Sequence, residues 1–382
     1  MRVYLLVMLV AAAVTYLTTP LARWLALRSG AITAVRDRDV HEVPIPRMGG
    51  VAMLLGMAVA LSLASQMPFL KGEFTGASPT WAILGGAALV CLLGAADDIW
   101  ELDWVTKLIG QVLAAGLMAG VGHVQLLALP LGEGVGLIGS GWLSLAATVL
   151  VIVVAINAVN FVDGLDGLAA GLIAIGGSAF FMYTYLLTTQ TSPLDHSNLA
   201  TLVLAVLVGA CLGFLPHNFY PARIFMGDSG AMLIGLTMAA AAILVTGQLN
   251  SLVTSQTGSV EVTARQQFPA FLPLLLPVAV LLLPLLDMGL AVVRRVGTGK
   301  SPFHADRRHL HHQLLQLGHT HRRAVLIMYL WTALFAFGGA ALVWWTTERV
   351  LWTVGVGTVG ALALTLGPLR GRVRARNGSA TS

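Results

Sequence analysis

The sequence predicts an all-α, polytopic integral membrane protein with about eleven transmembrane helices. Of its 382 residues, 57% are hydrophobic and only 10% are charged, whereas soluble domains carry about 25% charged residues. Apolar runs recur along the chain, and each is close to the ~20 residues that a helix needs to cross a ~30 Å hydrocarbon layer. Lys and Arg gather in alternate connections between these runs, as expected for a chain that crosses a membrane repeatedly.

The apolar runs have similar lengths and are separated by polar connections. In chain order they cover 3–19, 49–67, 81–96, 105–122, 142–158, 168–187, 199–215, 230–246, 270–293, 324–345 and 350–366. No connection is long enough to form a separate soluble domain. We therefore expect residues 1–368 to form a single transmembrane domain, followed by a basic cytoplasmic tail over 369–382.

The basic residues predict the orientation of the chain. Of the 22 Lys and Arg residues, 18 lie in the alternate set of connections that begins after the first run. By the positive-inside rule this set is cytoplasmic, which puts the N-terminus outside and the C-terminus inside the inner membrane. The net charge of +5 then reports orientation and contact with anionic lipid, not nucleic-acid binding. The loops that we expect to form a cytoplasmic site are 20–48, 97–104, 159–167, 216–229 and 294–323.

Five aspartates stand at span ends in this predicted cytoplasmic set: Asp97, Asp98, Asp163, Asp166 and Asp228. An ionised Asp at the centre of a bilayer costs about 2.5 to 3.5 kcal/mol, so we expect these side chains to line a wet cavity at the membrane interface. The adjacent pair Asp97 and Asp98 suits cation binding or proton abstraction. The competing interpretation for that pair is a solvated loop.

Amide side chains interrupt the apolar end of the fifth run. Asn157 and Asn160 precede Asp163 and Asp166 there. The neighbouring Gly164 and Gly167 permit an unwound turn, which would bring the amides and carboxylates around one cavity. The competing interpretation is a polar loop with incidental Asp-Gly turns.

A Gly-Asp-Ser-Gly element containing Asp228 precedes the eighth run. Backbone donors and a carboxylate at this place suit a metal-bound phosphate, although Asp228 or Ser229 could instead cap the following helix. Asn218, in the same connection, is a further candidate for substrate binding.

The loop over 294–323 combines His with Arg, and six of the ten His residues lie between His304 and His321. Clustered Arg residues hold phosphate oxygens through charge-assisted hydrogen bonds, and His assists in its neutral or cationic form. The competing interpretations are a solvated orientation signal and a zinc site, and no Cys accompanies the His residues to favour zinc. The phosphate-binding candidates here are Arg307, His309, His311 and His312.

Taken together, these elements resemble those of the polyprenyl-phosphate N-acetylhexosamine-1-phosphate transferases of glycosyltransferase family 4. The resemblance covers nearly the whole chain and rests on the elements at 41–50, 97–98, 157–166, 225–228 and 309–312. It implies ten or eleven membrane helices, a cytoplasmic active site and a requirement for Mg²⁺, with Mn²⁺ as a substitute. Leu310 interrupts the run of three His typical of the muramoyl-pentapeptide branch, so the chain looks more like the UDP-N-acetylglucosamine branch that serves teichoic acid, lipopolysaccharide or similar glycans.

The resemblance also implies individual roles. Asp228 would ligate Mg²⁺ with Asn160 beside it, while Asp97 and Asp98 would handle the lipid phosphate and Lys107 would stand near the phosphates. The remaining residues would bind the sugar nucleotide or lie in its neighbourhood: Asn157, Asp163, Asp166, Asn218, Arg307, His309, His311 and His312.

The expected reaction transfers N-acetylglucosamine 1-phosphate from UDP-N-acetylglucosamine to undecaprenyl phosphate and releases UMP, as the first membrane step of cell-envelope glycan synthesis. Direct attack and a phospho-Asp intermediate are both open, as is a homodimer. The alternative donors are UDP-muramoyl-pentapeptide and other UDP-N-acetylhexosamines. An ion-coupled transporter is the rival class, but it predicts acidic residues near span centres, and only Asp287 lies well inside a predicted span. A noncatalytic scaffold gives no reason for the Asn and Asp run.

Overall fold

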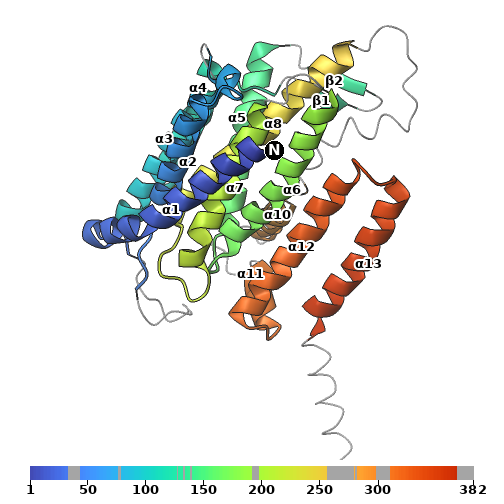
Figure 1. Cartoon of the computed structure of the whole chain (residues 1–382). Helices are drawn as coiled ribbons and strands as arrows, with labels where there is room; N and C mark the ends of the chain where they lie inside the picture. The colour runs from blue at the N-terminus through green and yellow to red at the C-terminus, as the bar shows by residue number, and fades with distance from the viewer. Residues whose placement is uncertain are drawn as a thin grey trace, which may run out of the picture.

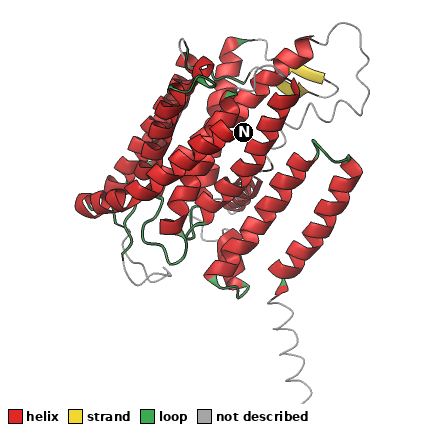
Figure 2. Cartoon of the chain, viewed as in Figure 1, coloured by secondary structure: helices red, strands yellow, loops and turns green. Residues whose placement is uncertain are grey.

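A computed structural model of the chain shows a bundle of long helices with one short hairpin (Figures 1 and 2). It describes residues 1–32, 44–75, 79–126, 128–131, 134–137, 140–191, 198–255, 279, 282–297 and 310–367. The predicted tail at 369–382 lies outside these described residues.

The helices follow the predicted apolar runs closely. They are α1 (Arg2–Ser29), α2 (Gly49–Ser65), α3 (Pro79–Trp100), α4 (Trp104–Val121), α5 (Gly141–Val162), α6 (Leu168–Thr191), α7 (Leu199–Asn218), α8 (Gly227–Ser255), α10 (Leu282–Gly297), α11 (Leu310–Gln316), α12 (His321–Ala341) and α13 (Thr347–Thr365). A 3-10 turn, η1 (Lys71–Phe74), precedes α3, and strands β1 (Ala128–Leu131) and β2 (Gly134–Leu137) form an antiparallel hairpin before α5. The ninth predicted run, 270–293, is described mainly through α10.

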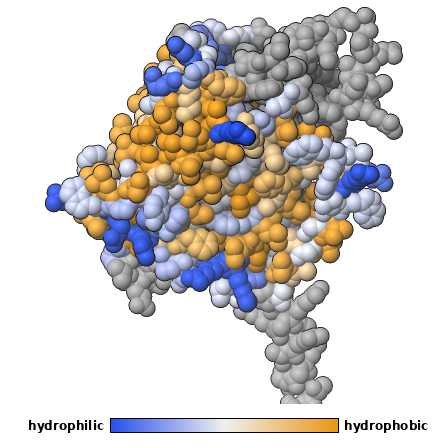
Figure 3. All heavy atoms as spheres, in the orientation of Figure 1, coloured by the Kyte–Doolittle hydropathy of each residue, from blue (hydrophilic) through white to orange (hydrophobic). Residues whose placement is uncertain are grey.

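The prediction of a polytopic membrane protein is confirmed. Within the described residues, eight helices are long and apolar enough to cross a membrane, namely α1, α3, α4, α5, α6, α7, α8 and α12. Helix α2 is apolar but shorter. Apolar residues cover much of the face seen in Figure 3, with hydrophilic residues mainly toward its edges, as expected for a surface in contact with lipid. The count of eleven spans and the orientation remain predictions.

Side-chain caps fix where several helices begin. The Asp103 carboxylate accepts the backbone N–H groups of Val105 and Thr106 at the start of α4, and these hydrogen bonds hold the pKa of Asp103 below its usual value. Ser140, Asn198 and Thr320 similarly cap α5, α7 and α12. Such caps satisfy backbone donors that a helix start leaves without an intrahelical partner.

Helices α7 and α8 form the centre of the bundle. In the most apolar 18-residue segment of each helix, 83% of α7 and 89% of α8 is buried. Helix α1 packs against both α7 and α2. Helices α3 and α5 pack against α8, and α6 packs against α7. A Cβ atom at Gly209 or Gly213 would lie only 2.2 Å from a backbone oxygen of α1, so the small residues of α7 let α1 approach closely. Helix α13 packs against α12 at the edge of the bundle (Figure 1).

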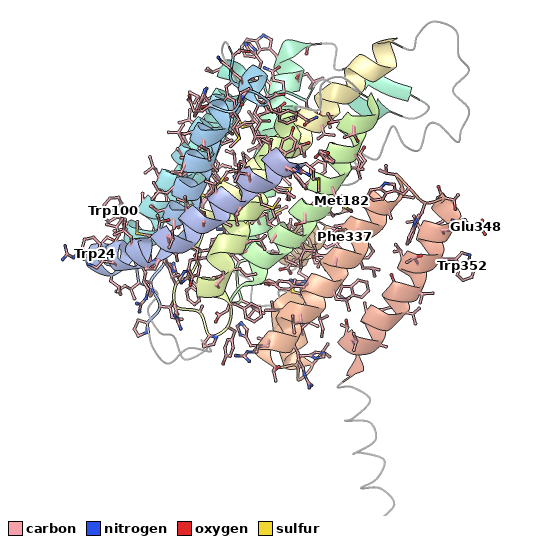
Figure 4. The ribbon with its side chains drawn as sticks, viewed as in Figure 1. Trp24, Trp100, Met182, Phe337, Glu348 and Trp352 are labelled. Atoms are coloured by element: carbon pink, nitrogen blue, oxygen red, sulfur yellow. The ribbon has the colours of Figure 1, made fainter. Side chains whose placement is uncertain are left out.

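The C-terminal ends of α1 and α3 lie on the same side of the bundle, where Figure 4 places Trp24 and Trp100. Both indole side chains are exposed, and exposed Trp is typical of a membrane–water interface. Trp352 and Glu348 lie on α13, at the opposite edge of the bundle in that view. The candidate site lies near the Trp100 end of α3.

Candidate active site

Four helices bring charged and amide side chains together at one end of the bundle. Helix α3 carries Asp97 and Asp98 in its last turn, and α4 carries Lys107 in its first turn. Asn160 lies in the last turn of α5, and Asp228 is the second residue of α8. The predicted convergence of these five residues is therefore present in the structure.

Lys107 bridges two carboxylates. Its Nζ lies 3.1 Å from Oδ2 of Asp97 and 3.2 Å from Oδ2 of Asp228. The Asn160 amide donates to the other Asp228 oxygen, Oδ1, at 2.9 Å. Both oxygens of Asp228 are thus held by side chains from two different helices. Two carboxylates share one ammonium group, which offsets only half of their combined charge.

Asp98 has a different role from its neighbour. Its two carboxylate oxygens accept the backbone N–H groups of Asp228 at 3.0 Å and Ser229 at 3.3 Å. The side chain is 6% exposed. A buried carboxylate at the start of α8 satisfies two backbone donors and lies at the positive end of the helix dipole. The sequence interpretation allowed a cap from Asp228 or Ser229, whereas the structure takes it from Asp98.

Asp97 keeps one carboxylate oxygen available. Its Oδ2 pairs with Lys107, while its buried Oδ1 has no hydrogen-bond partner among the described residues. A buried acceptor without a partner costs free energy, so this oxygen is suited to receive a proton or to bind a cation. Asp98 therefore binds the backbone at the start of α8, whereas Asp97 has an oxygen that could act on a ligand.

Glycines allow the backbones around Asp228 to approach closely. A Cβ at Gly94 would lie 2.3 Å from the Ser229 nitrogen, and a Cβ at Gly50 would lie 2.2 Å from the Gly230 nitrogen. Gly227 has a φ of +71°, a conformation that Gly adopts without strain. The start of α8 is therefore fitted between α2 and α3.

The element at 41–50, described from residue 44, frames this junction with backbone hydrogen bonds. Phe225 N–H donates to the Pro46 oxygen at 2.8 Å, and Gly49 N–H donates back to the Phe225 oxygen at 3.1 Å. Gly50 N–H donates to Met226 at 3.2 Å. These bonds hold the chain that leads into Asp228, a role that the sequence motif did not reveal.

Asn157 lies one helical turn before Asn160 on α5. Its Nδ2 donates to Gln111 Oε1 of α4 at 2.7 Å and to the Val153 backbone oxygen at 2.8 Å. Gln111 is 3% exposed. It is absent from the predicted site residues, although its position four residues after Lys107 places both on one helix face.

Asp163 lies at the end of α5 and is half-buried. Burial, followed by the nearby carboxylates of Asp228 and Asp98, raises the pKa of Asp163 to about 7, and the positive charge of Arg47 opposes this shift. Asp163 therefore shares the electrostatic environment of the cluster. Arg47 is a neighbour of the site that was not among the predicted site residues.

Asp166 and Asn218 link the connection between α5 and α6 to the end of α7 and the connection that follows it. Asp166 Oδ2 accepts the Ala222 N–H at 2.9 Å, and the Asp166 N–H donates to His321 Nε2 at 3.1 Å. Asn218 accepts the Gly167 N–H at 3.0 Å. The predicted unwound turn between α5 and α6 is present. These two buried side chains hold backbone groups around it, and their predicted roles in substrate binding stay predictions.

The His- and Arg-rich loop is only partly described. Arg307 and His309 lie outside the described residues, as do the side chains of His311 and His312 in α11. The start of α11 is tied to α10, because Leu310 N–H donates to the fully buried Asp287 carboxylate at 2.8 Å. The predicted phosphate-binding roles of this loop stay predictions.

The oxygen donors fit a magnesium ion that shares its ligands with a substrate. Among the described residues, no three His, Cys, Asp or Glu side chains converge as a complete metal site. Mg²⁺ commonly takes one or two protein carboxylates and completes its shell with water and phosphate oxygens. Asp97, through its free Oδ1, and Asp228 offer two such carboxylates.

An apolar groove of about 780 Å³ lies between α4 and α5 beside the cluster. Its lining includes Leu108, Val112 and Gly116 of α4, and Trp142, Val149 and Val153 of α5. Leu108 follows Lys107 directly in the chain, and the Val153 oxygen binds Asn157. One end of the groove therefore adjoins the polar site.

The fold and this cluster define an integral membrane enzyme with an acid- and amine-lined site at the end of a helical bundle. Comparison with known proteins gives the family. The family model of glycosyl transferase family 4 matches residues 80–246. The chain belongs to this family, the polyprenyl-phosphate N-acetylhexosamine-1-phosphate transferases, and is a phosphotransferase.

Three relatives illustrate the match. The chain is 44% identical over 380 residues to the decaprenyl-phosphate N-acetylglucosaminephosphotransferase of Mycolicibacterium smegmatis, covering 97% of this chain and 89% of that protein. It is 33% identical over 328 residues to the probable undecaprenyl-phosphate N-acetylglucosaminyl 1-phosphate transferase of Bacillus subtilis, covering 85% and 80%. A phospho-N-acetylmuramoyl-pentapeptide-transferase of Desulforudis audaxviator is 30% identical over 271 residues, covering 64% and 78%.

Proposed function

We propose that this enzyme transfers N-acetylglucosamine 1-phosphate from UDP-N-acetylglucosamine to undecaprenyl phosphate, with release of UMP, at the cytoplasmic face of the inner membrane. The observation that carries the proposal is the Lys107 bridge between Asp97 and Asp228, placed where an apolar groove ends. The named activities of the Mycolicibacterium and Bacillus relatives support the sugar and the lipid class.

The groove suits the hydrocarbon chain of the acceptor. Its lining on α4 extends from Leu108 to Leu117, which is roughly 14 Å at 1.5 Å per helical residue. The lining is aliphatic apart from Trp142, so it offers a polyprenyl chain dispersion contacts but no polar partner. A phosphate at the Leu108 end would lie beside the Lys107 ammonium.

The reaction requires two anions to meet. In this proposal an oxygen of the lipid phosphate attacks the phosphorus attached to the sugar, a new P–O bond forms, and the bond to UMP breaks. Lys107 neutralises phosphate charge, and Asp97 Oδ1 takes any proton that the acceptor still carries, because a phosphate monoester has a second pKa near ~6. Asp98 fixes Asp228 through its backbone. Mg²⁺, held by Asp228, would neutralise the diphosphate charge.

The test is UMP release by the purified full-length protein in detergent with Mg²⁺. UDP-N-acetylglucosamine and UDP-muramoyl-pentapeptide are compared as donors, and undecaprenyl and decaprenyl phosphate as acceptors. We expect turnover with the first donor, at least about a hundred-fold slower in Asp228→Asn because charge stabilisation of this kind is worth that much. The control is Thr184→Val, which removes a buried hydrogen bond between α6 and α7.

Each other outcome has a consequence. Turnover only with the pentapeptide donor would keep the chemistry and overturn the proposed sugar, and turnover only with decaprenyl phosphate would overturn the proposed acceptor. Exchange of labelled UMP into the donor without any acceptor would replace direct attack by a phospho-Asp intermediate. No turnover with any UDP sugar in folded protein would overturn the proposed class of donor.

A further inference from the structure

An amide pair, formed by the buried Gln111 and the half-buried Asn157, joins α4 to α5 next to the reaction site. The Asn157 Nδ2 group donates to Gln111 Oε1 at 2.7 Å and to the Val153 oxygen at 2.8 Å. Because both hydrogens of Nδ2 are used by protein acceptors, this nitrogen is not available to a substrate. Its partner outside α5 is the Gln111 side chain of α4.

The pair stands one helical turn from the two residues that hold Asp228. Gln111 follows Lys107 by four residues on α4, and Asn157 precedes Asn160 by three residues on α5. Residues at these spacings share a helix face. A hydrogen bond between Gln111 and Asn157 therefore fixes the separation and the register of Lys107 and Asn160 as well.

The register matters because the two Asp228 oxygens are held from opposite sides. Lys107 of α4 binds Oδ2, and Asn160 of α5 binds Oδ1. At the far end of the interface between α4 and α5, Leu126, which follows α4, exchanges hydrogen bonds with Thr148 and Ser144 of α5. The apolar groove lines the stretch of the interface that runs from the site to this far end, and its weak dispersion contacts set no specific register. The amide pair is therefore the hydrogen bond that fixes the register at the site end. Because Gln111 is buried at this contact, the hydrogen bond is stronger than it would be in water.

We infer that Gln111 and Asn157 are a positioning pair, which sets Lys107 and Asn160 on the two sides of Asp228 without touching the substrates. The inference rests on the proposed function and moves Asn157 from the predicted substrate-binding residues to this role. A displacement of about 1 Å at a reacting centre can cost a hundred-fold in rate. The pair consequently contributes to turnover more than to substrate affinity.

The experiment measures kcat and the KM of both substrates for Gln111→Leu and Asn157→Leu in the full-length protein. We expect kcat to fall about 10- to 100-fold in each, the size found when a supporting partner of a site residue is lost, with both KM values little changed. The double variant should lose no more than the worse single variant, because the two residues act through one bond. Thr184→Val again serves as the control for loss of a buried bond between helices.

Two further variants separate positioning from simple structural support. The exchange Gln111→Asn with Asn157→Gln preserves the combined length of the pair and should recover activity relative to Gln111→Asn alone. In a Lys107→Ala background, Gln111→Leu should cost much less than it does in the wild-type background. A full, multiplicative loss there, or an unchanged kcat in the single variants, would overturn the inference. Absence of wild-type turnover would instead overturn the proposed function.

Discussion

The Asp98 carboxylate accepts the backbone N–H of Asp228 at 3.0 Å, which makes a side chain of α3 the cap of α8. The preceding acid, Asp97, pairs with Lys107 and keeps a buried oxygen without a partner among the described residues. The two neighbouring aspartates thus have different contacts in the site. We therefore expect substitution of Asp98 to affect the stability of the protein, and substitution of Asp97 to affect mainly its activity.

Asp98→Ala should lower both the stability and the activity. Loss of a helix cap costs about 1 to 2 kcal/mol, and a shifted start of α8 would move Asp228. Asp97→Asn should keep the melting temperature close to that of the wild type while kcat falls about 10²- to 10⁴-fold, the usual contribution of a catalytic acid or base. Thermal unfolding and UMP release measured on the same samples check both expectations. Equal melting temperatures for wild type and Asp98→Ala would contradict the capping role.

Lys107→Met should make the melting temperature of the protein depend more strongly on Mg²⁺. Without the ammonium group, the carboxylates of Asp97 and Asp228 lose the charge that they share, and their repulsion should lower the stability by about 1 to 2 kcal/mol without metal. A divalent cation would then supply the missing positive charge. We therefore expect Mg²⁺ to raise the melting temperature of Lys107→Met by more than it raises that of the wild type. Lys71→Met, at an exposed lysine in η1, is the control. Equal shifts in all three proteins would show that the metal does not bind between these carboxylates.

The helices were predictable because apolar runs and their polar ends are local features of a sequence. Each predicted run coincides with a helix where the structure describes it, and the span ends with acidic residues do meet. The cap of α8 by Asp98 was not predictable, because 130 residues separate the partners and no local pattern encodes such a bond. The backbone hydrogen bonds of Asp166 and Asn218 were not predictable for the same reason, and the predicted substrate-binding roles of these two residues stay predictions.

Gly94→Ala should damage the site far more than Gly85→Ala on the same helix. The new Cβ at residue 94 would lie 2.3 Å from the Ser229 nitrogen, whereas at residue 85 nothing lies within 4 Å. Overpacking of this kind costs about 1 to 3 kcal/mol, while Ala in open space stabilises a helix by up to about 1 kcal/mol. Melting temperatures and kcat of the two variants check this. Similar behaviour of both variants would mean that α3 and α8 are not packed as closely as the structure shows.

Gly116→Phe tests the groove as the place of the lipid chain. Gly116 lines the groove, and no atom lies within 4 Å of its Cβ position, so an added ring would occupy the groove without a clash in the bundle. We expect the KM for polyprenyl phosphate to rise at least about ten-fold, which corresponds to a loss of about 1.4 kcal/mol of binding, while the KM for the UDP sugar is unchanged. Gly360→Phe on α13, at an exposed glycine that is equally open but outside the groove, should leave both values unchanged. A short-chain polyprenyl phosphate that does not reach residue 116 should be less affected by Gly116→Phe than the long acceptor. If the long acceptor keeps its wild-type KM in Gly116→Phe, the chain lies elsewhere on the bundle.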